Sequence, residues 1–269
     1  MLTHPTLDQL RALKLDGMAQ AFVELEAHEE TKALTHAEWL ALLLDREIAN
    51  RNNRRFETRL RAARLRHSQA AIEDVDYRTP RRLDKALFQQ LATCRWIAEH
   101  RGLLVSGPCG VGKSWLSCAL AQKACRDGYT VHYARVPRLF ADLDLAHGDG
   151  RFARLFRMLV KVDLLVMDDW GPDRLSVSQR RDLMEIVEDR HGRGSILITS
   201  QLPVATWHEV IGEPTLGDAI LDRIVHNAYR LELDGPSMRK IKAAEATEPP
   251  AQPATPTAAD RKPSKGAKT

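Results

Sequence analysis

The stretch that decides the fold runs from residue 103 to residue 124 and reads LLVSGPCGVGKSWLSCALAQKA. A short apolar run (103–106) and a helical segment (115–124) enclose eight residues that match G-x-x-x-x-G-K-[ST] in full. The glycines let the backbone curl so that successive N–H groups point at phosphates, and the N-terminus of the following helix adds a favourable dipole. We therefore predict a nucleotide site made of Gly107, Pro108, Cys109, Gly110, Val111, Gly112, Lys113, Ser114 and Trp115.

The pattern also assigns roles within this loop. Lys113 is expected to reach the β- and γ-phosphates, and the Ser114 hydroxyl is expected to take a Mg²⁺ position. A second apolar run, Leu164–Met167, ends in Asp168 and Asp169, and such a strand carries its carboxylates to the edge of the sheet beside the loop. We predict that Asp168 holds Mg²⁺ through water and that Asp169 orients or deprotonates the attacking water. ATP and Mg²⁺ are thus the expected cofactors, and ATP hydrolysis is the expected reaction.

Short apolar runs alternate with longer amphipathic segments from about residue 83 onward. The expected strands are Leu103–Ser106, Thr130–Ala134, Leu164–Met167, Ser195–Thr199 and Tyr229–Leu233. This alternation predicts an α/β domain with a mostly parallel sheet.

The first ~90 residues read as wholly helical. Two capping boxes are expected, Thr6 with Gln9 and Thr35 with Glu38, each opening an amphipathic helix. The second helix is expected from about His36 to His67, with one apolar stripe formed by Leu44, Ile48, Phe56, Leu60 and Ala63.

Three parts of the chain follow from these patterns. A small all-helical N-terminal domain for DNA binding and oligomerisation is predicted over residues 1–80, where Pro80 disfavours helix in the residue before it. An ATPase domain is predicted over residues 81–246. The last stretch, residues 247–269, has five prolines and no aromatic residue, and we expect a disordered basic tail.

Composition limits the location and class of the protein. With 43% hydrophobic and 28% charged residues, the chain of 269 residues is typical of a soluble globular protein. No apolar run approaches the ~20 residues that span a bilayer, and residues 1–17 lack a signal-peptide pattern. The four cysteines have no metal-binding spacing and are expected to be buried, so a reduced, cytoplasmic setting is predicted.

Basic residues are concentrated in one segment. Residues 46–66 contain eight arginines and two glutamates, a local excess of +6, on the second predicted helix. Guanidinium groups suit phosphate oxygens, so we predict sequence-independent binding of double-stranded DNA through its backbone. The residues assigned to this contact are Arg51, Arg54, Arg55, Arg59 and Arg61. The alternative is a solvated basic helix that pairs with Glu24, Glu26, Glu29 and Glu30.

Several short motifs, taken in order, resemble those of the AAA+ ATPases, specifically the DnaC/IstB branch. Besides the phosphate loop, they are LRALKLDGM (10–18), LVMDDWG (165–171), ITSQLP (198–203), LDRI (221–224) and GPSMR (235–239). The likeness covers about residues 1–242 and is greatest to the IstB-type helper ATPases of bacterial insertion sequences.

The resemblance implies further site residues. Gln201 would be the sensor I side chain, with Ser200 as the alternative, and Arg239 would be sensor II, acting on the ATP of its own subunit. Arg223 would be an arginine finger that reaches a neighbour's ATP, which implies a homo-oligomer. Most AAA+ proteins have Glu at the position of Asp169, although the IstB branch typically shows this pair of aspartates.

The resemblance implies an ATP-dependent transposition helper that oligomerises on duplex DNA and assists a partner transposase. The main alternative is a DnaC-like replicative helicase loader. Such loaders favour single-stranded DNA, which normally requires aromatic stacking, and residues 46–66 offer only Phe56. A small-molecule P-loop kinase would leave the arginine helix and the segments around Arg223 and Arg239 unexplained.

Overall fold

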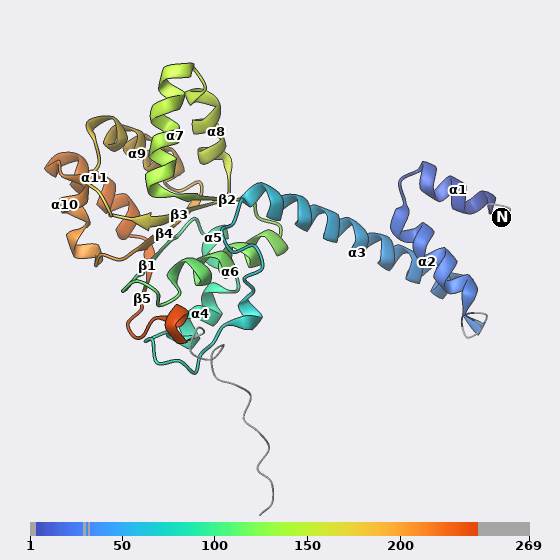
Figure 1. The fold of residues 1–269 in the computed structure, drawn as a ribbon. Helices are drawn as coiled ribbons and strands as arrows, with labels where there is room; N and C mark the ends of the chain where they lie inside the picture. Colours follow the sequence, from blue (N-terminus) through green and yellow to red (C-terminus); the bar gives the residue numbers. More distant parts are fainter. Residues whose placement is uncertain (1–3, 29–30, 32, 242–269) are drawn as a thin grey trace, which may run out of the picture.

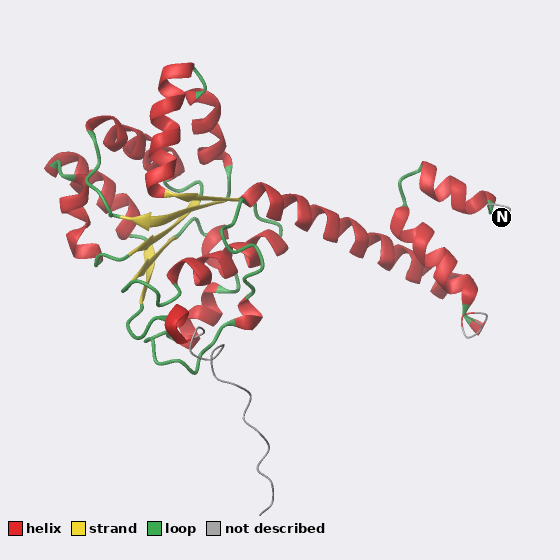
Figure 2. Ribbon diagram, in the orientation of Figure 1, coloured by secondary structure: helices red, strands yellow, loops and turns green. Residues whose placement is uncertain are grey.

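The computed structural model describes residues 4–28, 31 and 33–241. Its centre is a five-stranded parallel sheet in the order β2-β3-β4-β1-β5 (Figures 1 and 2). The strands are β1 (Gly102–Ser106), β2 (Val131–Arg135), β3 (Leu164–Trp170), β4 (Ser195–Ser200) and β5 (Ala228–Glu232). All five predicted strands are confirmed, and so is the α/β class. The predicted tail (247–269) and residues 242–246 lie outside the described residues.

Helices cover both faces of the sheet. On one face lie α4 (Lys85–Leu91), α5 (Arg95–Ala98) and α6 (Lys113–Arg126); on the other lie α7 (Val136–Asp149), α8 (Phe152–Lys161), α9 (Val177–Arg190), α10 (Trp207–Ile211) and α11 (Pro214–Val225). The short 3₁₀ helices η2 (Ile72–Asp74) and η3 (Val204–Thr206) lie in the connections.

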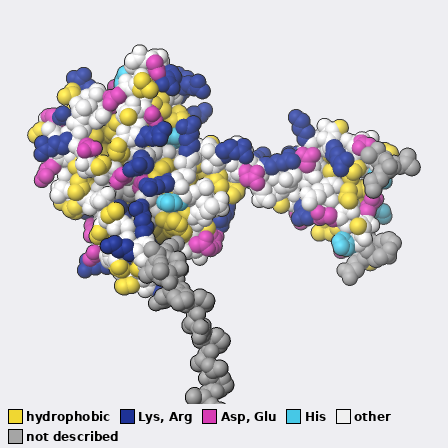
Figure 3. Space-filling model, in the orientation of Figure 1, with side chains coloured by type: hydrophobic (Ala, Val, Ile, Leu, Met, Phe, Trp, Pro, Cys, Tyr) yellow, Lys and Arg dark blue, Asp and Glu magenta, His cyan; other side chains and the backbone are white. Residues whose placement is uncertain are grey.

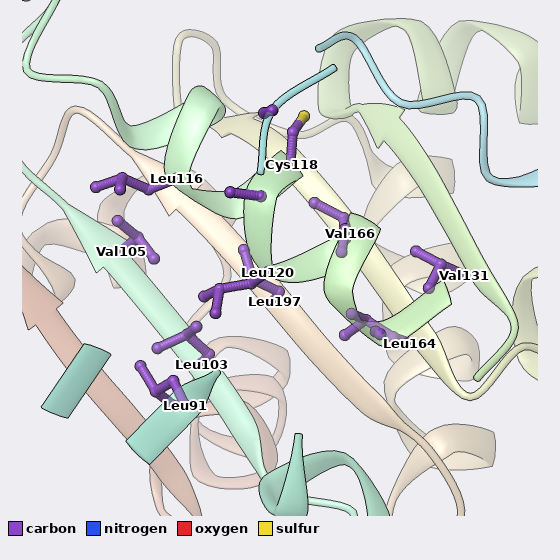
Figure 4. Close-up of a cluster of buried hydrophobic side chains, with 14 of the residues drawn as sticks. Leu91, Leu103, Val105, Leu116, Cys118, Leu120, Val131, Leu164, Val166 and Leu197 are labelled. Atoms are coloured by element: carbon purple, nitrogen blue, oxygen red, sulfur yellow. The ribbon is translucent and has the colours of Figure 1, made fainter. Parts of the chain in front are cut away.

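Successive residues of the strands alternate between two cores. Leu103 and Val105 pack with α6 in one cluster (Figure 4), whereas Leu104 packs in the cluster on the opposite face. Because both faces are buried, the strands read as continuous apolar runs rather than as alternating patterns.

Three helices precede the ATPase domain: α1 (Pro5–Ala12), α2 (Asp16–Ala27) and α3 (His36–Ala63). Their small core contains Leu7, Met18, Ala19, Ala21, Phe22 and Leu43. The buried carboxylate of Glu47 on α3 accepts hydrogen bonds from the N–H groups of Gly17 (2.8 Å) and Met18 (3.2 Å), at the start of α2. This contact fixes α2 on α3, which then extends as one long helix to the ATPase domain (Figure 1).

The prediction of a single apolar stripe on α3 is wrong. Leu44 and Ile48 are 46% and 56% exposed, and the buried side chains that face α2 are Leu43 and Glu47. Further along, Ala63 is buried and Phe56 half-buried against the ATPase core. The helix changes its packing partner along its length, so no single stripe serves both halves.

The ends of these helices also differ in part from the sequence-based expectation. The helix α3 ends at Ala63 rather than His67, because the next residue, Arg64, is left-handed with φ 54°. Its Thr35–Glu38 capping box is confirmed. The expected box at Thr6 is absent, because α1 already begins at Pro5, a residue whose fixed φ suits the first helical position.

Residues 63–80 pack against the ATPase domain. Ala63, Ala70 and Val75 belong to the same buried cluster as β1 and α6. The domain boundary at residue 80 stays a prediction, but in packing terms α1, α2 and the first half of α3 form the separate unit. Within the described residues, no helix combines the length and apolar character needed to cross a membrane.

Candidate nucleotide site

The phosphate loop connects β1 to α6 at the carboxyl edge of the sheet, as predicted. Gly107 has φ 145°, and a Cβ there would lie 2.2 Å from the carbonyl oxygen of Leu233. Gly112 has φ 97°, and a Cβ there would lie 2.7 Å from Nη1 of Arg81. Only glycine fits these two positions, because side chains are disfavoured at positive φ and the space is filled.

Lys113 is curled back over the loop. Its Nζ donates to the carbonyl oxygens of Gly107 (2.7 Å) and Pro108 (2.8 Å), and burial lowers the pKa of this ammonium. An incoming phosphate can replace these two carbonyls. Cys94, Cys118 and Cys125 are buried as predicted, but Cys109 is exposed because it lies in the loop that faces the cavity.

Asp168 is a buried carboxylate with three hydroxyl donors. Its Oδ1 accepts from Ser114 Oγ (2.8 Å) and Thr199 Oγ1 (2.5 Å), and its Oδ2 accepts from the Tyr133 hydroxyl (2.5 Å). Burial and the contact with this carboxylate raise the pKa of Tyr133, so its hydroxyl keeps the proton that it donates. Ser114 and Asp168 therefore place a hydroxyl and a carboxylate side by side at the loop.

In a regular strand Asp168 and Asp169 would face opposite sides of the sheet, but β3 is irregular between Met167 and Trp170. Asp169 has φ 68°, and its N–H donates to Thr199 Oγ1 at 3.0 Å. Its carboxylate pairs with Arg135 Nη2 (2.8 Å) and lies 3.5 Å from Nε2 of Gln201. Because of this irregularity, both aspartates line the cavity over the loop, with Asp168 buried and Asp169 partly exposed.

A cavity of about 390 Å³ lies over the loop. Its lining includes four of the five residues predicted to be catalytic: Lys113, Asp169, Gln201 and Arg239. The segment predicted to be sensor II is attached to the loop by the N–H of Met238, which donates to the carbonyl of Gly110 at 2.9 Å. Segments separated by more than 100 residues are therefore brought together at one site.

Arg223 lies elsewhere. Its Nη2 pairs with Glu188 Oε2 at 2.7 Å, and its Nη1 donates to the carbonyl of Ala219 at 2.9 Å. It lines a smaller cavity with Gly102 and Asn227, at the amino ends of β1 and β5. The nucleotide cavity is at the carboxyl edge, so Arg223 is remote from the loop of its own chain.

Sequence reasoning missed several residues of the site. Tyr133 and Arg135 lie on β2, Thr199 is the next-to-last residue of β4, and Arg66 and His67 come from the segment after α3. Tyr133, Arg135 and Thr199 could have been predicted from the sequence, because polar side chains at the carboxyl ends of parallel strands gather at one edge of the sheet. Arg66 and His67 could not have been predicted, since their position depends on where α3 ends.

The arginines assigned to DNA lie on α3, and several have protein partners. Arg51 pairs with Glu47 (2.7 Å) and Arg54 with Asp16 (2.8 Å). Arg59 donates from Nε to the carbonyl of Cys125 at 2.8 Å. Arginine side chains, in dark blue, are visible along this helix in Figure 3. Of the glutamates named in the alternative, Glu24 pairs with Arg46 (2.6 Å), while Glu29 and Glu30 lie outside the described residues.

The parallel sheet, the phosphate loop and the pair of aspartates define the class of this protein: it is a P-loop ATPase of the AAA+ type. Over residues 8–246, the chain matches the family described as IstB-like ATP binding protein, and it belongs to that family. It is an ATP-binding enzyme that hydrolyses ATP.

Two relatives, both named as insertion sequence ATP-binding proteins of Sinorhizobium fredii, are similar over nearly their whole length. One is 59% identical over 240 residues, covering 89% of this chain and 98% of the relative. The other is 49% identical over 242 residues, covering 90% and 97%.

Solved structures support the fold. DnaI has a TM-score of 0.54 at 24% identity and is matched over 61% of this chain and 91% of its own. The DnaC helicase loader has a TM-score of 0.51 at 21% identity, over 62% and 98%.

Proposed function

We propose that this ATPase is a transposition helper: ATP-bound subunits assemble on duplex DNA and assist a partner transposase. The family and the names of the relatives, which are insertion sequence ATP-binding proteins, support a role in transposition. The observation that carries the DNA part is α3, a helix of 28 residues that carries the assigned arginines and whose first half extends beyond the ATPase domain (Figure 1).

The nucleotide cavity suits ATP hydrolysis. Lys113 neutralises the β- and γ-phosphates, and Gln201 and Arg239 line the cavity as expected of the two sensors. Asp169 orients and deprotonates the attacking water, while Arg135 fixes the direction of its carboxylate.

The donor set at the loop fits Mg²⁺, which prefers hard oxygen ligands and is held by few protein groups together with phosphates. Ser114 and Asp168 would hold the ion, and it would neutralise charge that develops on the phosphates.

The position of Arg223 supports an oligomer in which each nucleotide is completed by a neighbour. Because Arg223 is remote from its own loop, it can reach a nucleotide only in another subunit, which requires a head-to-tail contact. We propose that Arg223 leaves Glu188 when subunits assemble and stabilises the charge on the neighbour's γ-phosphate.

Fluorescence anisotropy with unrelated duplexes and single strands, with and without a non-hydrolysable ATP analogue, tests the DNA proposal. The sharpest variant combines Arg55→Ala with Arg61→Ala, since both side chains are exposed and Arg59 has a structural contact. We expect weaker binding on all duplexes and a flatter salt dependence, because each lost phosphate contact removes about 0.9 from the slope of log K against log[salt].

The matched control combines Arg95→Ala with Arg193→Ala, two exposed arginines of the ATPase domain. It should leave affinity and salt slope near the wild-type values. Equal effects of the two double variants would refute a specific role of α3. A preference for single strands would instead favour the helicase-loader function.

A further inference from the structure

Arg66 lies at the nucleotide cavity, although its position in the sequence groups it with the eight arginines of residues 46–66. The left-handed backbone of Arg64 ends α3 and turns the chain toward the ATPase domain. Leu65 then packs half-buried against the ATPase core. As a result, Arg66 and His67 line the same cavity as Lys113.

The tie between Arg66 and the protein is weak. Its Nη1 is 4.0 Å from Asp168 Oδ2, which is an ion pair but too long for a hydrogen bond. Both oxygens of Asp168 already accept hydrogen bonds from hydroxyl groups. The side chain of Arg66 is 41% exposed, whereas that of Asp168 is 1% exposed.

Of the three other arginines that line the cavity, Arg81 and Arg135 are already engaged, whereas Arg239 is the predicted sensor II. Arg81 donates to the carbonyls of Asp76 (2.7 Å) and Val111 (3.2 Å), and Arg135 is paired with Asp169. Within residues 4–28, 31 and 33–241, no oxygen accepts a hydrogen bond of normal length from the Arg66 guanidinium. Its five N–H donors are therefore directed into a cavity that takes a polyanion.

We propose that Arg66 binds the triphosphate of its own chain's ATP and transmits nucleotide occupancy to α3. Its position beside Asp168 places the guanidinium at the γ-phosphate end of the cavity, so it distinguishes ATP from ADP. An arginine fork makes paired, charge-assisted hydrogen bonds to phosphate oxygens. This inference rests on ATP binding and is independent of the DNA proposal.

Arg66 is close in the chain to the end of α3. Only Arg64 and Leu65 separate Arg66 from the last residue of α3. One turn earlier, Arg59 donates to the carbonyl of Cys125 at the end of α6, the helix that begins with the phosphate loop. A displacement of Arg66 toward a phosphate therefore acts directly on the end of α3.

The test compares Arg66→Gln with the wild-type protein in the absence of DNA. Competition against a fluorescent ATP analogue gives the dissociation constants of ATP and ADP. We expect ATP to bind about tenfold more weakly and ADP to change by less than about threefold, since hydrogen bonds to charged groups are worth more than neutral ones. Arg66→Lys should recover part of the ATP affinity, because it keeps the charge but lacks the fork.

Hydrogen exchange over residues 59–67 measures the transmission to α3. In the wild-type protein, ATP should protect this segment more than ADP does, and Arg66→Gln should abolish the difference. The control is Arg95→Gln, which changes an exposed arginine of α5 outside the cavity and should leave both affinities and the exchange difference unchanged.

Each result decides one part of the proposal. Unchanged ATP affinity in Arg66→Gln overturns the contact with the triphosphate. Equal losses for ATP and ADP, with a lower melting temperature of the nucleotide-free protein, show that Arg66 only supports the fold. Weaker ATP binding with an unchanged exchange difference overturns the transmission to α3.

Discussion

Turnover completed in trans by Arg223 can be tested by mixing two inactive variants. Arg223→Ala keeps an intact nucleotide cavity but lacks the finger. Asp169→Asn keeps the finger and ATP binding but lacks the group that activates water. Each variant alone should be inactive, and the mixture should regain activity, because an intact cavity can then face an intact finger.

The magnitudes follow from the geometry. The Arg223–Glu188 pair is 27% and 53% exposed, so its loss should cost the fold less than about 1 kcal/mol. Removing an arginine finger lowers turnover by ~10³–10⁵. In an equal mixture, half of the cavities are intact and half of those face an intact finger, so about a quarter of wild-type turnover should return in a head-to-tail assembly.

The assay is phosphate release at several total protein concentrations and mixing ratios. Wild-type turnover per subunit should rise with concentration as subunits associate. The reasoning is refuted if turnover per subunit is constant at all concentrations and the mixture is no more active than its components. Arg223 would then act only within its own chain, through its contact with Glu188.

Three further predictions concern ligand binding and stability. Lys113→Ala should lose the ~2.7 kcal/mol of stabilisation that ATP–Mg²⁺ gives at 100 times its dissociation constant, whereas Asp169→Asn should keep it in thermal unfolding but release no phosphate. Arg190 is fully buried and donates to five backbone carbonyls, so urea unfolding should show that Arg190→Met lowers the free energy of unfolding by about 3–5 kcal/mol. The exposed Arg193→Ala is the control and should change it by less than about 0.5 kcal/mol. Burial raises the pKa of Glu47, but its hydrogen bonds more than offset this and leave the pKa below 4.5. The ionised Glu47 therefore stabilises the fold above pH 4.5, and this stabilisation is lost as the pH falls through the pKa of Glu47 in the folded protein. Hydrogen exchange in α2 should become faster over this pH range, and Glu47→Gln should remove the pH dependence.

The local motifs were the most predictable part of the site. The phosphate loop needs only residues 107–114 in order, and each strand is encoded by its own apolar run. The pairing of Asp168 with Ser114 could be anticipated, because strands that end at one sheet edge bring their last residues together.

Contacts that depend on long-range packing were not predictable from the sequence. The pattern of α3 cannot show that its first half packs on α2 and its second half on the ATPase domain, so Leu44 was expected to be buried. The left-handed turn at Arg64 has no signal in the sequence, and it alone sends Arg66 into the nucleotide cavity instead of along the helix.

The length of α3 gives it a mechanical advantage. Its 28 residues extend about 42 Å at 1.5 Å per residue. From Phe56 to Ala63 the helix packs on the ATPase domain, so the arm that can swing runs from His36 to Phe56 and is about 30 Å long. A tilt of about 10° at Phe56 moves the far end of this arm by about 5 Å. The displacement of the far end is thus set by the length of the arm rather than by the chemistry of the cavity.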